Sequence, residues 1–565
     1  MRGRSVIRGL LRAVFGGRRR RRKEGRDGPG PGRRPAALPR ARAGGPEGPS
    51  GPGQHEPDRT EGLTGRAEGL TGRTEDATNR AERLSGSAER AVKQIQEAFG
   101  HSVELVARTF RTARGRAAAA VYINGLVSTP SIAHYIIAPL STDRDADEPV
   151  AAEKEPVRTL REAIQALTSG KCVLLLEGSP AAAFDVRSWA MRSVDQSEVE
   201  PSETGPVESF VEDLSTNIVL IRRRLRTENL QTERIIIGRE SRTDVRIVYL
   251  RGIVRDALVE EVRSRLKKID VDTPFDVHFL EEMTTDTPWS PFPGAMTTVR
   301  PDRVAAMLTE GHVAVLIDGT PMVMIVPGTL AALLQAADDY YSNYYVASFT
   351  RVIRWIAGLI GLMASPLYVA VISYHHELIP SRLLFTIAAA REGVPFPPII
   401  EALLMELAFE LLREAGLRVP RQIGQALSIV GVLVIGDAAV RAGLVSPLMI
   451  VIVGISAIST FAIPSAALAD TVRLLRFPII LLAGVLGLFA VTFGLLLIMG
   501  LLIASRSYGV PYLTPFLPVS SRGLRDAMLR MPMWLQWYRP WQMVNPGRRR
   551  QQAPGQMPRP EPEEE

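Results

Sequence analysis

Carboxylates lie within an otherwise apolar stretch that predicts a helix over residues 399–412, and they are Glu401, Glu406 and Glu410. Glu406 and Glu410 are four residues apart and share one face of that helix, whereas Glu401 points away from it. A carboxylate in apolar surroundings has to meet water, an ion or an arginine. Two interpretations stay open: an acidic stripe that attracts cations, or structural pairs with Arg391, Arg413 or a neighbouring subunit.

The backbone just before this helix is predicted to be broken. Arg391 and Glu392 precede a run of residues that interrupt helices, namely Gly393, Pro395, Pro397 and Pro398. Irregular backbone at membrane depth is tolerated only where it is buried in protein or lines water. Segment 383–412 is therefore predicted to be a re-entrant or interfacial element.

A further acidic residue, Asp437, follows Gly436 near the end of an apolar run. At that position a helix partner or an ion has to satisfy its charge. Asp437 is therefore a second candidate for an intramembrane charge.

Apolar runs long enough for transmembrane helices occupy residues 352–374, 423–440, 444–468 and 478–504. Together with segment 383–412 they predict an α-helical polytopic membrane domain over residues 350–505. Arg351 and Arg354 precede the first run and place the preceding region on the cytoplasmic side. Charge counting leaves the number of spans open; we favour four with a cytoplasmic C-terminus over five.

The region before the membrane domain is predicted to be soluble α/β. Short β-branched or aliphatic runs alternate there with amphipathic helical stretches. The expected strands are 119–123, 173–176, 246–250, 313–317 and 322–325, and the expected helices include 157–167, 208–225 and 256–266. An acidic, loop-like segment at 193–206 separates two small subdomains, 98–195 and 207–337.

Both ends of the chain are predicted to be tails. Residues 1–50 carry 15 Arg or Lys against 3 acidic residues, a net charge of +12 in a chain whose total is +8. Residues 1–97 are read as a basic, Gly/Pro-rich tail with a heptad-like, partly helical end, either solvated or held on anionic lipid. No aromatic residue interrupts the arginine run 18–22, so nucleic-acid binding is not expected. Residues 506–565 are predicted to be an amphipathic region followed by a disordered tail.

The sequence gives no sign of catalysis. It contains no phosphate-binding loop, nucleophile elbow, zinc-helix motif or dinucleotide fingerprint. Cys172 is the single cysteine, which excludes an internal disulfide and a multi-cysteine metal site. We expect no enzymatic activity, no cofactor and no metal.

Several sequence strings occur together in the second half of the chain. They are IPSRLLFTIAAAREGVPFPPIIEALLMELAFELLREAGLRVPRQIGQALSIVGVLVIGDAAV (379–440), FAIPS (461–465), LRFP (475–478) and YGVPYLTP (508–515). Upstream lie TNIVLIRRRLR (216–226), SPFPG (290–294) and LIDGTPMVMIVP (316–327). On these strings the chain resembles the A subunits of spore germinant receptors, the GerA family, from about residue 114 to about residue 537.

That resemblance implies a subunit of the inner spore membrane which helps to trigger germination as an oligomeric, nutrient-gated channel for monovalent cations. It also implies two partners, an integral membrane B subunit and a lipoprotein C subunit, in addition to membrane lipid and further copies of the chain. The alternatives are a non-conducting scaffold or ion transporter of a germination complex, or the stage V sporulation paralogue. No inverted internal repeat supports a transporter.

Overall fold

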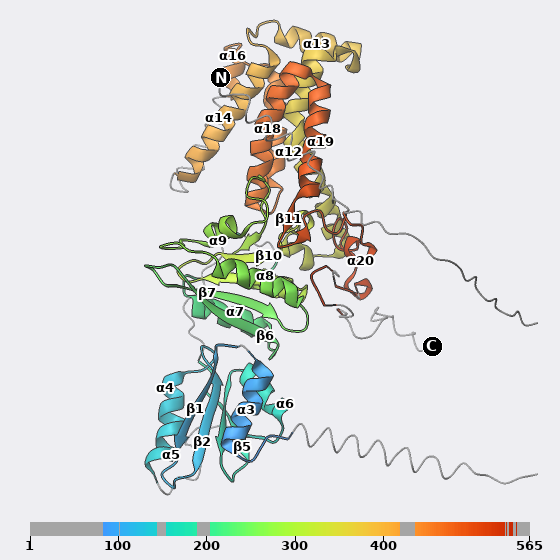
Figure 1. Cartoon of the computed structure of the whole chain (residues 1–565). Coiled ribbons are helices and arrows are strands. Elements are labelled where there is room, and N and C mark those ends of the chain that lie inside the picture. The colour runs from blue at the N-terminus through green and yellow to red at the C-terminus, as the bar shows by residue number, and fades with distance from the viewer. Residues whose placement is uncertain are drawn as a thin grey trace, which may run out of the picture. The chain divides into compact units, whose positions relative to one another are not determined.

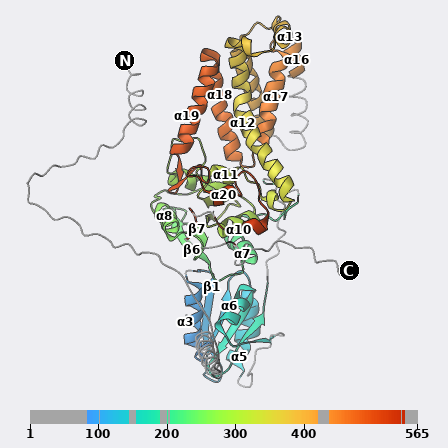
Figure 2. The same ribbon diagram turned by 90° about the vertical axis from the view of Figure 1, so that its right-hand side faces the viewer.

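The computed structural model describes residues 83–100, 102–143, 154–188, 200, 204–418, 436–536, 538–539, 542–545 and 550. Within them two five-stranded α/β subdomains come first in the chain and a helical region follows (Figures 1 and 2). This order confirms the predicted succession of α/β and helical parts. The predicted basic tail before residue 83 lies outside the described residues.

The first subdomain is an antiparallel sheet with strand order β1-β2-β4-β5-β3. Its strands are β1 (Leu105–Arg111), β2 (Ala117–Ile123), β3 (Lys154–Val157), β4 (Lys171–Leu176) and β5 (Ala181–Asp185). Helices α3 (Ala88–Phe99) and α6 (Leu160–Thr168) pack on one face. The run α4 (Thr129–Ser131), η1 (Ile132–Ile137) and α5 (Ala138–Thr142) packs on the other.

Helix α3 corrects the predicted tail boundary at residue 97. Its apolar residues recur at helical spacing, and Ala91, Ile95 and Phe99 are fully buried in the core of the first sheet. The predicted partly helical end of the tail overlaps this helix, but its burial in the core of the sheet was not predicted. The first subdomain therefore begins ahead of α3.

The second subdomain is an antiparallel sheet with strand order β6-β7-β9-β10-β8. Its strands are β6 (Leu230–Ile237), β7 (Thr243–Leu250), β8 (Met296–Thr298), β9 (Val313–Ile317) and β10 (Val323–Val326). Helices α8 (Asp256–Lys267) and α9 (Val277–Thr284) cover one face, and α7 (Leu214–Arg224) and α10 (Pro301–Thr309) cover the other. Because both faces are covered, β9 reads as a continuous apolar run.

The helical region begins after α11 (Leu330–Leu333) and η2 (Ala337–Tyr340). It contains α12 (Tyr344–Tyr374), η3 (His376–Leu378), α13 (Ser381–Arg391), α14 (Pro398–Arg418), α16 (Gly436–Arg441), α17 (Pro447–Phe461), α18 (Ala466–Leu486) and α19 (Leu488–Ala504). Helix α12 packs against α14, α17, α18 and α19 and so forms the centre of the described helices (Figures 1 and 2).

Two predicted spans differ from the observed helices. The side chain of Ser465 caps a helix that starts at Ala466, so the expected span 444–468 divides between α17 and α18. Pro478, predicted to begin a span, lies inside α18, and the turn at Gly487, with φ of 62°, separates α18 from α19. Most of the predicted span 423–440 lies outside the described residues.

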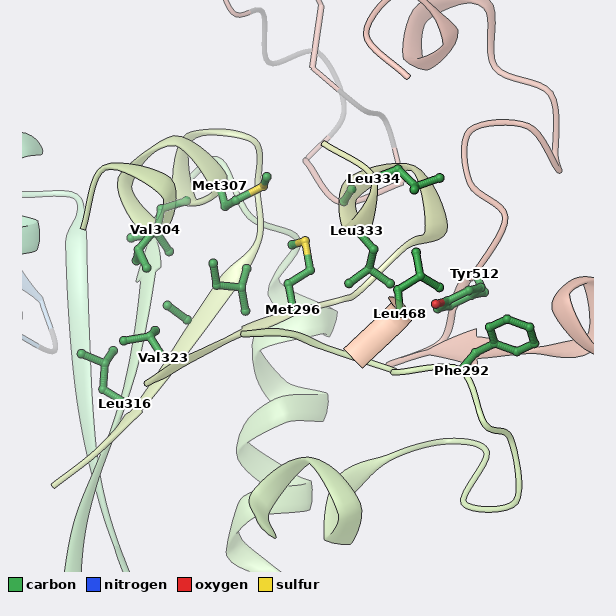
Figure 3. Close-up of a cluster of buried hydrophobic side chains, with 14 of the residues drawn as sticks. Phe292, Met296, Val304, Met307, Leu316, Val323, Leu333, Leu334, Leu468 and Tyr512 are labelled. Carbon is green, nitrogen blue, oxygen red and sulfur yellow. The ribbon is translucent and has the colours of Figure 1, made fainter. Parts of the chain in front are cut away.

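The chain then returns to the second subdomain. After β11 (Arg506–Ser507) and β12 (Val510–Pro511), Tyr512 enters the same buried cluster as Phe292 and Leu333 (Figure 3). Tyr508 is buried on the opposite face of the sheet, where its hydroxyl lies 2.6 Å from that of Thr284. The segment continues through α20 (Ser521–Leu524) and η5 (Met533–Leu535).

This return corrects the prediction of an amphipathic region followed by a tail for residues 506–565. Farther along, Val544 forms an isolated β-bridge with Val254. The segment buries aromatic and aliphatic side chains in a folded core, which helical periodicity alone does not reveal. Residues 551–565 lie outside the described residues.

Candidate functional site

Among the described residues α12 is the one helix long and apolar enough to cross a membrane, and α17 and α19 are shorter apolar helices. With 31 residues, α12 extends for about 46 Å, more than the roughly 30 Å of a bilayer core. The candidate site is the set of charged side chains on α14 together with their partners on α13 and α18.

Glu401 lies in the first turn of α14 and is fully buried. Its carboxylate accepts hydrogen bonds from the backbone N–H of Ser446, at 2.6 Å, and from the Ser446 hydroxyl. Arg391, the last residue of α13, forms an ion pair with it, with Nη1 at 3.1 Å from Oε2. The carboxylate therefore joins the end of α13 to the start of α17.

Glu406 lies deeper, between α12 and α18. Its Oε2 is 2.6 Å from Arg476 Nη1, and each side chain is 3% exposed. The Ser365 hydroxyl of α12 donates to Oε1 at 2.5 Å, and Arg476 Nε donates to the carbonyl oxygen of Gly361 at 2.7 Å. The buried charge is thus paired and hydrogen-bonded, as a low dielectric requires.

Glu410 lies one turn farther along α14 and is 39% exposed. Its Oε1 is 3.1 Å from Arg413 Nη1 and 3.2 Å from Arg473 Nη1. Both arginines also pair with Asp470, so two carboxylates and two arginines form one network. Glu410 is therefore the least buried of the three glutamates and shares its partners.

This geometry answers part of the question left open by the sequence. All three glutamates pair with arginines, and the partners named in advance, Arg391 and Arg413, are among them. Two further partners, Arg473 and Arg476, both lie in the interior of α18. Their pairs join residues 63 and 70 apart in sequence, which local spacing does not predict.

Asp437 is placed differently from expectation. It occupies the first turn of α16, is 57% exposed and pairs with Arg441 four residues on, at 2.8 Å. An acidic residue at the start of a helix and an arginine at its end also complement the helix dipole. The structure does not bring Asp437 together with the three glutamates.

The predicted backbone break is present between α13 and α14, at residues 392–397. Glu392, Gly393, Pro395 and Pro397 are exposed, and Pro398, the first residue of α14, is half-buried. A Cβ on Gly443 would come within 3.0 Å of the Gly393 carbonyl oxygen, so this loop packs closely on the turn after α16. Whether the break lines an aqueous path stays a prediction.

The chain thus combines two antiparallel α/β subdomains with apolar helices that enclose arginine–carboxylate pairs. Residues 93–542 match the sequence profile of the family described as Bacillus/Clostridium GerA spore germination protein. Spore germination protein KA of Bacillus subtilis (strain 168) is 39% identical over 456 residues, which cover 79% of this chain and 83% of that protein. The chain belongs to the GerA family of spore germination proteins.

The chain is also similar to a protein named as a membrane protein and to a solved domain of a germinant receptor subunit. The uncharacterized membrane protein YfkQ of Bacillus subtilis (strain 168) is 37% identical over 449 residues, or 77% of this chain and 87% of that protein. The crystal structure of the N-terminal domain of the A subunit of the Bacillus megaterium spore germinant receptor GerK3 matches with a TM-score of 0.35 and 29% identity. That match covers 43% of this chain and 96% of the solved chain.

Proposed function

We propose that this chain is the membrane A subunit of a spore germinant receptor, and that copies of it assemble into a nutrient-gated channel for monovalent cations in the inner spore membrane. It would act with a B subunit in the membrane and a C-subunit lipoprotein, as a receptor component rather than an enzyme. Family membership supports this proposal, as does a relative whose name describes a membrane protein.

The surface of the helical region supports a membrane location. Large apolar side chains are exposed along α12, among them Phe349, Ile356 and Leu359, and along α19, among them Phe489 and Phe493. Apolar exposure on this scale is unfavourable in water and favourable in lipid or against another subunit. Either environment agrees with an oligomeric membrane protein.

The two ends of the helical region support an even number of membrane crossings. At the start of α12, Arg351 lies 2.7 Å from Asp339 and 2.8 Å from Asp526 of the returning segment. After α19, the Ser507 hydroxyl donates to the Gly294 carbonyl oxygen of the second subdomain, at 2.5 Å. Both ends therefore meet the same subdomain, which favours a C-terminal segment on the cytoplasmic side over the five-span arrangement.

The observation that carries the proposal is the presence of charged side chains among apolar helices. Each charged residue at the centre of a bilayer costs about 3 kcal/mol on insertion scales, so such residues usually serve a function. Glu401 and Glu406 are enclosed and already paired, which suits a structural role. Glu410 is the carboxylate within reach of water, and we assign it to the ion pathway.

A non-conducting scaffold is the second candidate function, and the pairing of Glu401 and Glu406 favours it. Their charges are compensated inside one copy of the chain, so neither needs a permeating ion. A transporter subunit and the stage V sporulation paralogue remain further alternatives within the same family. Measurements of ion flux separate conducting from non-conducting roles.

The decisive experiment is reconstitution of the full-length chain in liposomes, with and without its partner subunits, followed by measurement of potassium and sodium flux. Glu410→Gln should lower cation flux several-fold while the amount of assembled oligomer stays unchanged, because glutamine keeps the size and removes the charge. Glu414→Gln is the matched control, since Glu414 is exposed on the same helix and pairs with Arg418 four residues on. Absence of flux from the assembled wild-type complex would favour the scaffold, and normal flux in Glu410→Gln would remove that residue from the pathway.

A further inference from the structure

A cavity of about 370 Å³ lies between the second subdomain and the returning C-terminal segment. Residues of α10, α11 and η2 line it on one side, and residues between 514 and 550 line it on the other. Its lining is mainly apolar and includes Met307, Ala332, Met533 and Leu535. A cavity of this volume is in the range that holds small molecules and exceeds the space needed by a single water.

His312, which precedes β9, is one of the residues that line the cavity. The side chain is buried, and its Nδ1 lies 3.2 Å from the carbonyl oxygen of Met307. That contact requires a proton on Nδ1, which leaves Nε2 as a hydrogen-bond acceptor. Nε2 has no hydrogen-bond partner among the described residues. Burial lowers the pKa of His312 to about 4, so the ring is neutral near pH 7.

A second residue of the lining, Thr514, also has an unsatisfied buried atom. Thr514 is 3% exposed, and its Oγ1 has no partner within the described part of the chain. Buried polar groups in native proteins are nearly always hydrogen-bonded, so two such atoms on residues that line one cavity point to an occupant that would bond them.

The two carboxylates of the lining, Glu310 and Asp526, are already paired. Glu310 forms an ion pair with Arg550. Asp526 accepts from the Tyr340 hydroxyl, at 2.8 Å, and pairs with Arg351. The carboxylates of the lining are thus committed to arginines, and a cationic ligand would have to displace one of them. An uncharged ligand meets no such obstacle.

We propose that this cavity binds a small neutral molecule with an apolar body and a hydroxyl or N–H group that donates to His312 Nε2. The Thr514 hydroxyl would hydrogen-bond the same polar end. The site is separate from the buried ion pairs of the helical region and does not depend on ion conduction. Tyr340 and Asp526, which line the cavity, also hold Arg351 at the start of α12, so the occupant would lie beside the first apolar helix.

The test uses full-length protein in detergent micelles and two isomeric probes, benzyl alcohol and anisole. Both have the same atoms and a similar apolar body, but only benzyl alcohol has a hydroxyl donor. Saturation-transfer NMR titrations should show benzyl alcohol binding about three- to ten-fold more tightly than anisole, the value of one hydrogen bond. Binding with equal affinity, or no protein-dependent signal from either probe, would overturn the proposal and leave a cavity filled by water.

Variants locate the binding. His312→Phe keeps an aromatic ring at this position and removes the Nε2 acceptor, so the preference for benzyl alcohol should disappear. Thr514→Val should weaken benzyl alcohol binding several-fold, and it serves as the independent test if His312→Phe does not give a cooperative melt. His278→Phe is the control, because His278 is partly exposed on α9 and is not part of the cavity lining. An unchanged preference in either cavity variant would overturn the assignment.

Discussion

Substitution of Glu406 by glutamine removes the negative partner of a buried arginine. Arg476 is 3% exposed and lies 2.6 Å from Glu406, between α14 and α18. Loss of one member of a buried ion pair costs about 3–5 kcal/mol in soluble proteins, because the remaining charge is stranded. In the membrane location proposed above, the unfolded helices find other polar partners, so we expect a loss near the lower end, about 3 kcal/mol.

The assay is thermal melting of the detergent-solubilised full-length protein, together with the amount of assembled protein recovered from membranes. Glu414→Gln is the control on the same helix, since its pair with Arg418 is exposed on both sides. An exposed pair contributes between about 0 and 1 kcal/mol, so this variant should melt close to the wild type. Glu406→Gln should melt well below both.

A double variant tests the cause of the loss. Arg476→Met removes the stranded charge and keeps most of the volume, so Glu406→Gln combined with Arg476→Met should lose less stability than the sum of the two single variants. The expected coupling is about 2 kcal/mol. Additive losses, or a Glu406→Gln variant as stable as Glu414→Gln, would refute the claim that this pair holds α14 against α18.

Two other predictions concern the α/β subdomains. Burial lowers the folded-state pKa of His312 from 6.5 to about 4, so the unfolded chain binds more protons between these values. The unfolding free energy should therefore fall by up to about 3 kcal/mol as the pH drops through that window, and His312→Phe should flatten this part of the melting profile. Glu104→Ala should strand Arg222, which it pairs with at 2.9 Å between the two sheets, and cost about 2 kcal/mol. Hydrogen exchange in β1 and β6 should then accelerate, whereas Glu155→Ala, which breaks an exposed pair with Lys171, should leave it unchanged.

Sequence patterns predicted the strands and helices whose buried residues form a continuous or regularly spaced apolar pattern. The apolar runs of β2, β4, β7, β9 and β10 lie where the sequence placed strands, because strands in covered sheets must be apolar on both faces. Strand β6, with the sequence LQTERIII, carries four polar residues after Leu230, and it is absent from the predicted strands. Helix α6 ends within one residue of the predicted end at residue 167. It starts at a capping box made by Thr159 and Glu162.

The candidate site was predicted only in part. The spacing of residues along one helix shows which carboxylates share a face, but it does not show which distant arginines they pair with. Spacing identified Glu406 and Glu410 on one face, and Arg413, three residues beyond Glu410, was a named partner. Arg476 reaches Glu406 only because α18 begins at Ala466, twelve residues before the proline that marked the predicted start. The return of Tyr512 to the second sheet likewise depends on tertiary packing and has no local signal.

The location of Tyr508 and Tyr512 in the two cores of the second sheet has a consequence for biosynthesis. Phe292 leaves the ribosome well before Tyr512, with all of the helical region between them, yet their rings pack 6.1 Å apart. During translation the sheet therefore lacks buried side chains on both faces until α19 has been made. A nascent chain stopped at Ser505 would expose cavities in a domain whose strands are all complete. The second subdomain is thus complete only after every helix between Phe292 and Tyr508 has been synthesised.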